Sequence, residues 1–91
     1  MQHCNNKNAK IILATLAKII KEERLKQNKS QRLLADEYDI QKSMLSRLES
    51  AVNEPKILSL FSVCEALNIK LSDLFLKLEA ELPENTTLID K

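Results

Sequence analysis

The chain contains no glycine among its 91 residues, and this absence restricts its possible folds more than any other feature. Glycine reaches positive φ without steric cost, and tight β-hairpins and phosphate-binding loops depend on it. A sequence without glycine therefore disfavours β-sandwiches, Rossmann folds and P-loops. The natural alternative is a set of helices joined by short turns, and 91 residues suit one domain with one modest core.

The composition agrees with a helical protein. Hydrophobic residues make up 44% of the chain and aromatic residues only 3%, so Leu, Ile and Ala must supply most of the core. The sequence lacks a run of about 18 apolar residues and an apolar leader, which argues against a membrane span and a signal peptide. Cys4 and Cys64 form no Cys-x-x-Cys pair and are interpreted as free thiols. These features predict a cytoplasmic protein.

Hydrophobic periodicity predicts five helices, because apolar residues recur at every third or fourth position, as in a helix that covers a core. The predicted helices span about residues 8–27, 31–37, 41–50, 56–67 and 73–82. Together they form one domain at residues 8–82, with a flexible N-terminal tail at 1–7 and a C-terminal tail at 83–91.

Polar residues and prolines define the expected helix ends. Ser30 and Ser72 are suitable N-caps for the second and fifth helices. Asp39 is expected to adopt the left-handed conformation after the second helix, since Asp tolerates positive φ better than most residues. Pro55 fits the start of the fourth helix, where its missing N–H does no harm, and Pro83 ends the fifth.

The apolar residues of the last two helices predict a core and a possible interface. The expected apolar spine of the fourth helix consists of Leu60, Phe61, Cys64 and Leu67. Tyr38 is also interpreted as a core residue. The fifth helix carries Leu74, Phe75, Leu76, Leu78 and Leu82. The core can take about half of these, and the remainder could form a two-fold dimer interface.

This order of elements resembles the lambda repressor/Cro-like (XRE-type) helix-turn-helix family over about residues 16–75. The resemblance is carried by Arg24, Ser30-Gln31, Leu34-Ala35, residues 43–49, Pro55, residues 65–69 and residues 71–75. It implies an all-α, compact five-helix domain, lambda repressor-like, in which the second helix braces the third against the major groove of DNA. The chain departs from the family at Asp39 and Ala51, where Gly is common, and at Lys56, where Ser or Thr is common.

The third helix, at about residues 41–50, is the expected recognition helix. Leu45 and Leu48 face inward together with Gln41, and the opposite face is polar. The expected base-contacting residues are Lys42, Ser43, Ser46 and Arg47. A guanidinium such as that of Arg47 can pair with O6 and N7 of guanine, which would contribute about 1–3 kcal/mol of discrimination.

Other residues are expected to contact the DNA backbone or to support the fold. The expected phosphate contacts are Gln31, Lys29, Asn53 and Lys56. Gln31 begins the second helix, where free N–H groups and the helix dipole favour a phosphate, and the resemblance implies that it also buttresses the third helix. The resemblance further implies a partly buried ion pair between Arg24 and Glu49, which is interpreted as structural and not as part of the site.

No set of residues suggests catalysis, so the protein is not expected to be an enzyme, and no cofactor or metal site is expected. His3 is the only histidine; a histidine at the third position can bind Cu(II) or Ni(II), but such a role is not favoured. The charge is asymmetric, because residues 1–32 carry eight Lys or Arg and two acids, while residues 33–91 carry six and eleven. A basic first third is compatible with a polyanionic partner or with a solvated helix face.

Together these observations predict a small transcriptional regulator that binds double-stranded DNA sequence-specifically. It would act as a homodimer on an inverted repeat, with the surplus apolar residues of the fifth helix at the interface. A phage repressor, an antitoxin and a restriction-modification controller are all compatible with these residues. The alternative is a protein-interaction module with this fold and little DNA binding, and a net charge of only +1 leaves it open.

Overall fold

The structure, a computed structural model, describes residues 6–89. Within that part the chain forms five α-helices and no strand, which confirms the all-helical fold expected from the sequence. The helices are α1 Lys7–Lys26, α2 Gln31–Tyr38, α3 Lys42–Ser50, α4 Ile57–Ala66 and α5 Leu71–Glu81. The expectations for His3, for Cys4 and for most of the tail at 1–7 lie outside the described residues.

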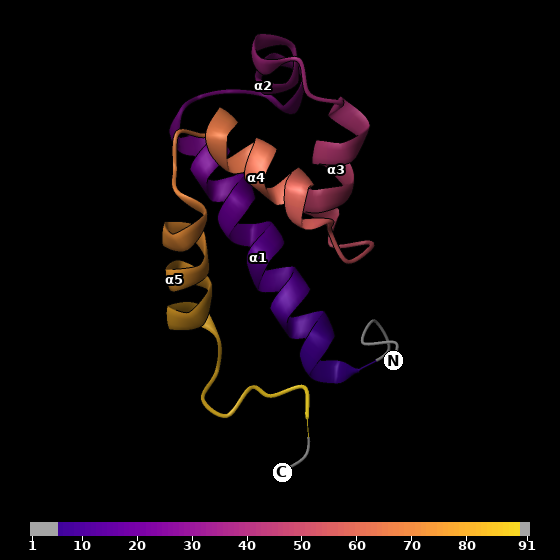
Figure 1. Ribbon diagram of the computed structural model, residues 1–91, viewed down its shortest axis with the longest axis vertical. Coiled ribbons are helices and arrows are strands. Elements are labelled where there is room, and N and C mark those ends of the chain that lie inside the picture. The colour runs from indigo at the N-terminus through magenta and orange to yellow at the C-terminus, as the bar shows by residue number, and fades with distance from the viewer. Residues whose placement is uncertain (1–5, 90–91) are drawn as a thin grey trace.

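The long helix α1 runs through the molecule, and the other helices pack around it (Figure 1). α5 lies along one side of α1, α3 lies on the other side, and α4 crosses in front. α2 packs on α3 near the end of the molecule. Every helix contributes to one core, whose main residues are Leu16, Ile19, Ile20, Leu34, Leu45, Leu48, Leu60, Val63, Cys64, Leu67, Leu74 and Leu78.

Each of the helices α1 to α4 is followed by a residue in the left-handed conformation. These residues are Asn28, Asp39, Ala51 and Asn68, with φ between 55° and 59°. The prediction for Asp39 is therefore confirmed. Asn and Asp tolerate positive φ better than other non-glycine residues, so three of these four helix ends are explained by residue type. Ala51 is the exception, because its Cβ is strained there.

The helix starts agree only partly with the sequence. Ser30 caps α2 as predicted, because its Oγ accepts a hydrogen bond from the N–H of Leu33 at 3.0 Å. The prediction for Ser72 is wrong: α5 begins at Leu71, and its N-cap Lys70 makes no side-chain cap bond. Leu71 is half-buried against the core, and this packing starts the helix two residues earlier than predicted and leaves Ser72 inside it.

The prolines lie close to the expected helix ends. Pro55 does not open α4, because the N-cap is Lys56 and the helix begins one residue later, at Ile57. Lys56 is extended, with ψ of 147°, so the chain enters the helix after the proline. α5 ends at Glu81, and Pro83 follows shortly after, as predicted.

Two aromatic residues expected in the core are at the surface. Tyr38 is 50% exposed, and the ammonium of Lys29 lies 5.5 Å from the centroid of its ring. Phe61 is 49% exposed, because the buried stripe of α4 runs through Leu60, Val63, Cys64 and Leu67 and Phe61 lies about 100° round the helix from Leu60. The packing position assigned to Phe61 belongs to Val63.

Cys64 behaves as expected from the sequence. Its side chain is buried in the core with 2% of its surface exposed. Burial raises the pKa of the Cys64 thiol to about 11, so the group stays protonated near neutral pH. It serves as a small apolar residue.

The C-terminal segment at 83–89 is not helical. It nevertheless returns to the start of α1, where the side-chain amide of Asn8 donates a hydrogen bond to the carbonyl of Thr87 at 2.6 Å. Leu88 also borders an apolar hollow against Ile12 and Leu16 of α1. The division into a domain at 8–82 and two tails stays a prediction.

A buried ion pair ties α1 to α3. The Nε and Nη2 atoms of Arg24 donate to the two carboxylate oxygens of Glu49, each at 2.8 Å. The side chains are only 7% and 3% exposed. Hydrogen bonding to Glu49 raises the pKa of the Arg24 guanidinium above its ordinary value. The ion pair implied by the resemblance is therefore present.

Two more hydrogen bonds complete this network, which we call the Arg24–Glu49 network. The Nη1 of Arg24 donates to the carbonyl of Lys29 at 2.7 Å, in the turn before α2. The side-chain amide of Gln31 donates to Oε1 of Glu49 at 3.1 Å, so Gln31 supports α3 through this carboxylate. The network fixes α1, the start of α2 and the end of α3 relative to one another.

Replacing Ala51 by glycine should stabilise the protein. A left-handed alanine costs about 1–2 kcal/mol, and glycine loses about 0.5–1 kcal/mol of backbone entropy on folding, so Ala51→Gly should raise the free energy of unfolding by about 0.5–1 kcal/mol. Urea denaturation measures the change. The matched control is Ala14→Gly, at an exposed position inside α1, which should lose about 1 kcal/mol. Equal losses in both variants would contradict the strain at Ala51.

Removing one member of the buried ion pair should be far more damaging than removing both. Arg24→Ala leaves the Glu49 carboxylate buried and unpaired, which typically costs about 3–5 kcal/mol. The double variant Arg24→Met/Glu49→Leu buries no charge and should lie within about 1–2 kcal/mol of the wild type. Chemical denaturation of the three proteins gives the comparison. A loss below about 1 kcal/mol in Arg24→Ala would show that the pair is not a structural centre.

Candidate nucleic-acid interface

α2 and α3 form a compact unit with one polar side. The connection between them is short, since α2 ends at Tyr38 and α3 begins at Lys42. Leu45 and Leu48 of α3 are buried, with 0% and 6% of their surfaces exposed. The inward face of the predicted recognition helix is therefore confirmed for these two leucines. The outer side of α3 is available for contacts with another molecule.

The structure places the predicted base-contacting residues on this outer side to different degrees. Lys42, Ser43 and Arg47 are exposed, and Ser46 is half-buried. Lys42 and Ser43 belong to the first turn of α3, whereas Arg47 lies in its last turn. The four side chains therefore follow the length of the helix, as residues that contact successive bases would.

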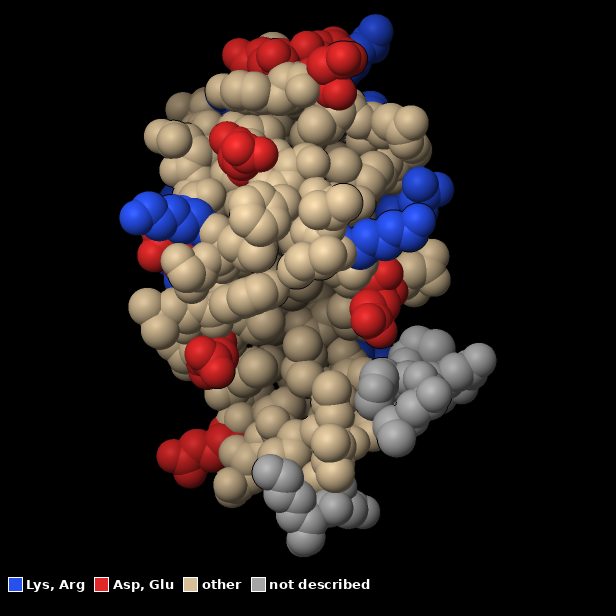
Figure 2. Space-filling model, in the orientation of Figure 1, with Lys and Arg blue, Asp and Glu red and all other residues tan. Residues whose placement is uncertain are grey.

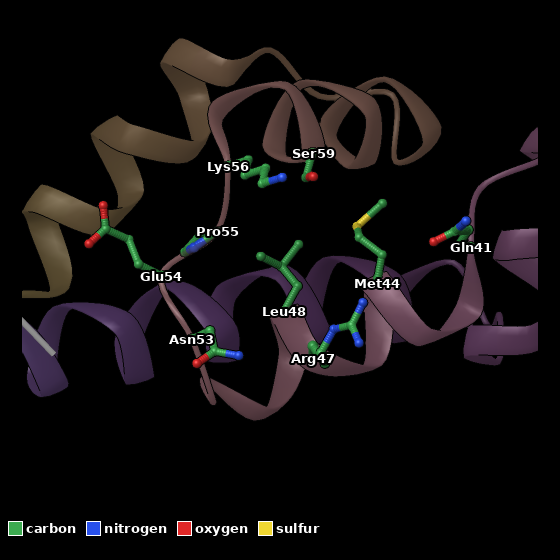
Figure 3. A pocket seen from close by; sticks show the side chains of 9 residues that line it. All are labelled: Gln41, Met44, Arg47, Leu48, Asn53, Glu54, Pro55, Lys56 and Ser59. Atoms are coloured by element: carbon green, nitrogen blue, oxygen red, sulfur yellow. The ribbon is translucent and has the colours of Figure 1, made fainter.

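A pocket of about 290 Å³ brings three of the predicted residues together between α3 and the start of α4 (Figure 3). Arg47 lies on the α3 side, Lys56 on the α4 side, and Asn53 on the loop that joins the helices. Leu48 forms part of the floor. The remaining predicted site residues, Lys42, Ser43, Ser46, Lys29 and Gln31, do not line this pocket.

The start of α4 gives this pocket the character of an anion site. Lys56, the N-cap residue, makes no side-chain cap hydrogen bond, so no side chain caps the N–H groups of the first turn. A helix N-terminus also carries a partial positive charge. Glu54 borders the same pocket, but its carboxylate points away from Arg47 (Figure 3). The charges of Lys56 and Arg47 and the amide of Asn53 therefore surround the hollow.

The side chain of Lys29 already interacts with two residues of α2. Its ammonium lies 2.7 Å from a carboxylate oxygen of Glu37 and above the ring of Tyr38. The hydrogen bond to Glu37 raises the pKa of the Lys29 ammonium above its ordinary value. A phosphate at this position would compete with Glu37 for the same charge.

Gln41 is a candidate that the sequence interpretation missed. It is the N-cap residue of α3, with extended ψ of 125° and no side-chain cap hydrogen bond, and its side chain is exposed and lines the pocket near Arg47. Helical periodicity placed it on the inward face with Leu45, but that periodicity does not hold for a residue outside the helix. Glutamine can pair with N6 and N7 of adenine.

Met44 is a second candidate site residue that the sequence interpretation missed. It is half-buried, packs against the core and lines the same pocket, and Figure 3 shows its side chain directed toward α4. An apolar side chain at the edge of a recognition surface can contact the methyl group of thymine. Only the structure could identify it, because the pocket depends on how α4 packs beside α3.

Comparison with known proteins agrees with this geometry. A family model described as Helix-turn-helix (HTH_3) matches residues 20–74, which is more than half of the chain and includes every residue of the predicted site. No significant match to a curated protein was found. Among the helices of the described part, none is long and apolar enough to cross a membrane. With an all-helical core, a braced α2–α3 unit and this match, the chain belongs to the lambda repressor-like (XRE-type) helix-turn-helix family of DNA-binding regulators.

Proposed function

We propose that the protein is a sequence-specific transcriptional regulator that binds double-stranded DNA with α3 in the major groove. The observation that carries the proposal is the pocket between α3 and α4, which exposed Arg47 and Gln41 line together with Lys56 at the uncapped start of α4. Side chains that can recognise bases and a helix terminus that can bind a phosphate therefore occupy one surface. The Arg24–Glu49 network holds this surface in place.

Base recognition is assigned to the outer side of α3. Arg47 would pair with guanine and Gln41 with adenine, each bidentate pair contributing about 1–3 kcal/mol of discrimination. Lys42 would reach a guanine or a phosphate, and Ser43 and Ser46 would allow close approach and hydrogen bonds of either polarity. Met44 would contact a thymine methyl.

Backbone contacts would fix the register of α3 on the DNA without specifying sequence. Lys56, Asn53 and the first N–H groups of α4 surround a hollow that suits one phosphate. Gln31 lies at the start of α2 and could contact a second phosphate while it still supports Glu49. Lys29 would contribute only after exchanging Glu37 for a phosphate.

In this proposal the protein acts by occupying DNA and requires no catalysis, cofactor or metal. It would bind an inverted repeat as a homodimer, because two copies related by a two-fold axis can place their recognition helices about 34 Å apart, one DNA turn. The compartment that fits such a regulator is the cytoplasm, where bacterial and phage DNA is transcribed.

Replacing Arg47 should remove sequence preference without unfolding the protein. When purified protein selects fragments from a random duplex library, the wild type should enrich a short motif that contains guanine. Arg47→Ala should lose preference at that position, with affinity for the best motif falling about 5–150-fold. The control is Lys10→Ala, which removes one charge from the start of α1 and should leave the motif unchanged. Enrichment of the same motif by Arg47→Ala would contradict the assignment.

Salt dependence should separate DNA binding from the alternative of a protein-interaction module. If several phosphates are neutralised, the logarithm of the DNA affinity should fall linearly with the logarithm of salt concentration, with a slope of about −0.9 per phosphate contact. Lys56→Ala should weaken binding to all sequences alike and reduce the slope by about 1. Fluorescence anisotropy at four or more salt concentrations gives the slope. Affinity that does not change with salt would favour the interaction module.

A further inference from the structure

The outer surface of α4 is unusually apolar for a helix at the surface. Ile57, Leu58 and Phe61 are 55%, 74% and 49% exposed. Phe61 is four residues from Ile57 and three from Leu58, so the three side chains are neighbours on one side of the helix. We call them the α4 face. An exposed apolar patch of this kind on a small domain commonly marks a contact with another macromolecule.

The surroundings of the α4 face carry little charge. Within α4 the only charged residue is Glu65, near the C-terminal end. Figure 2 shows an uncharged area in the middle of the same face, with both acidic and basic side chains around it. A two-fold interface brings the same patch from two molecules together, so a charge near the axis would face its own copy. A patch without charge avoids this repulsion and can pair with itself.

α5, which the sequence favoured as the dimer surface, suits this purpose less well. Leu74 and Leu78 are buried, and Phe75 and Leu82 pack against the core. Leu76 is therefore the one large apolar residue of α5 with high exposure, at 67%. Its neighbours one helical turn away include Asp73 and Glu79, and a two-fold contact there would bring like charges together.

Ion pairs to α1 occupy further charged groups of α5. The Nζ atom of Lys77 lies 2.7 Å from Oε2 of Glu23, and Oε1 of Glu81 lies 3.1 Å from Nζ of Lys18. The surface of α5 that adjoins α1 is therefore charged and solvated. Most of the apolar residues that suggested an interface on α5 are instead buried in the core or packed against it.

We propose that the α4 face is the docking surface for a second copy of this chain, with the two α4 helices antiparallel across a two-fold axis. The proposal rests on the proposed function, since it names the interface of the DNA-binding homodimer. Antiparallel packing places the two Glu65 residues at opposite ends of the contact. Because α4 has ten residues and is about 15 Å long, these two charges would be separated by more than a Debye length of about 8 Å.

The size of the α4 face predicts a weak dimer. Stable interfaces bury about 800 Å² on each partner, which three partly exposed side chains cannot supply alone. We therefore expect dissociation constants of about 1–100 µM in the absence of DNA. The start of α4 also borders the pocket beside Arg47, so the interface and the DNA contacts lie on one helix. Two adjacent half-sites would raise the effective concentration of the second copy and strengthen the dimer.

Sedimentation equilibrium of the full chain without DNA, from about 5 to 500 µM, tests the proposal. The wild type should change from monomer to dimer within this range, and Leu58→Glu should remain monomeric. Leu76→Glu is the matched control, since it places the same charge at a similarly exposed leucine of α5, and it should dimerise as the wild type does. An equimolar mixture of Leu58→Glu and Leu58→Lys should recover dimers, which a misfolded variant could not do.

A wild type that is monomeric over the whole range would overturn the proposal, as would dissociation by Leu76→Glu and not by Leu58→Glu. Arg47→Ala separates this test from that of the proposed function. It should dimerise normally while it loses sequence preference. Leu58→Glu should keep salt-dependent binding to duplex DNA while it loses cooperative binding to two half-sites. Loss of DNA preference in Arg47→Ala with an intact dimer therefore bears on the function alone.

Discussion

The Arg24–Glu49 ion pair is the interaction on which the arrangement of the other helices depends. Removing two charges from water is expensive, and such a pair is tolerated only when its remaining donors and acceptors are satisfied. Here both carboxylate oxygens accept from Arg24, the third nitrogen of the guanidinium reaches the carbonyl of Lys29, and Gln31 adds a further bond. Helix α1, the turn before α2, the start of α2 and the end of α3 are therefore joined by one network of hydrogen bonds.

This network has a functional consequence because it ends on α3. Glu49 lies two residues after Arg47, so the position and tilt of the last turn of α3 follow from a contact with α1. The same turn leads through Ala51 to the loop that carries Asn53 and Pro55 and then to the start of α4. The shape of the pocket between α3 and α4 therefore depends on the buried ion pair. A residue that never touches DNA can thus determine how α3 meets it.

The absence of glycine is visible at each of these junctions. Asn28, Asp39 and Asn68 end their helices at positive φ with little strain. Ala51 adopts the same conformation at the end of α3 without a side chain that favours it. The strained alanine lies between the Arg24–Glu49 network and the pocket, so the rest of the fold must compensate for it.

Features that depend on neighbouring residues in the sequence could be predicted. The helix count, the cap at Ser30, the left-handed Asp39 and the end of α5 before Pro83 all follow from local chemistry. Features that depend on packing could not. Leu71 draws the start of α5 past Ser72, and Val63 takes the buried position assigned to Phe61. Tyr38 lies under Lys29 at the surface, because other residues fill the core.

The candidate site shows the same division. Arg47 was identified because it lies on the polar side of a periodic helix, and that signal is local. Gln41 was assigned to the wrong face because it precedes the helix and does not share its period. The convergence of Arg47, Asn53 and Lys56 on one pocket depends on how α4 packs beside α3, which sequence periodicity does not encode. The family resemblance supplied the pairing of Arg24 with Glu49, which no local pattern indicates.

The central claim is that α3 recognises bases from the major groove through Arg47. Protection of a bound DNA motif from methylation by dimethyl sulfate tests it directly, because the reagent attacks guanine N7 in the major groove and adenine N3 in the minor groove. We expect protection of one guanine in each half-site, about one DNA turn apart, and loss of that protection with Arg47→Ala under conditions where the variant is still bound. Protection confined to adenine N3, or guanine protection that persists in Arg47→Ala, would contradict the account.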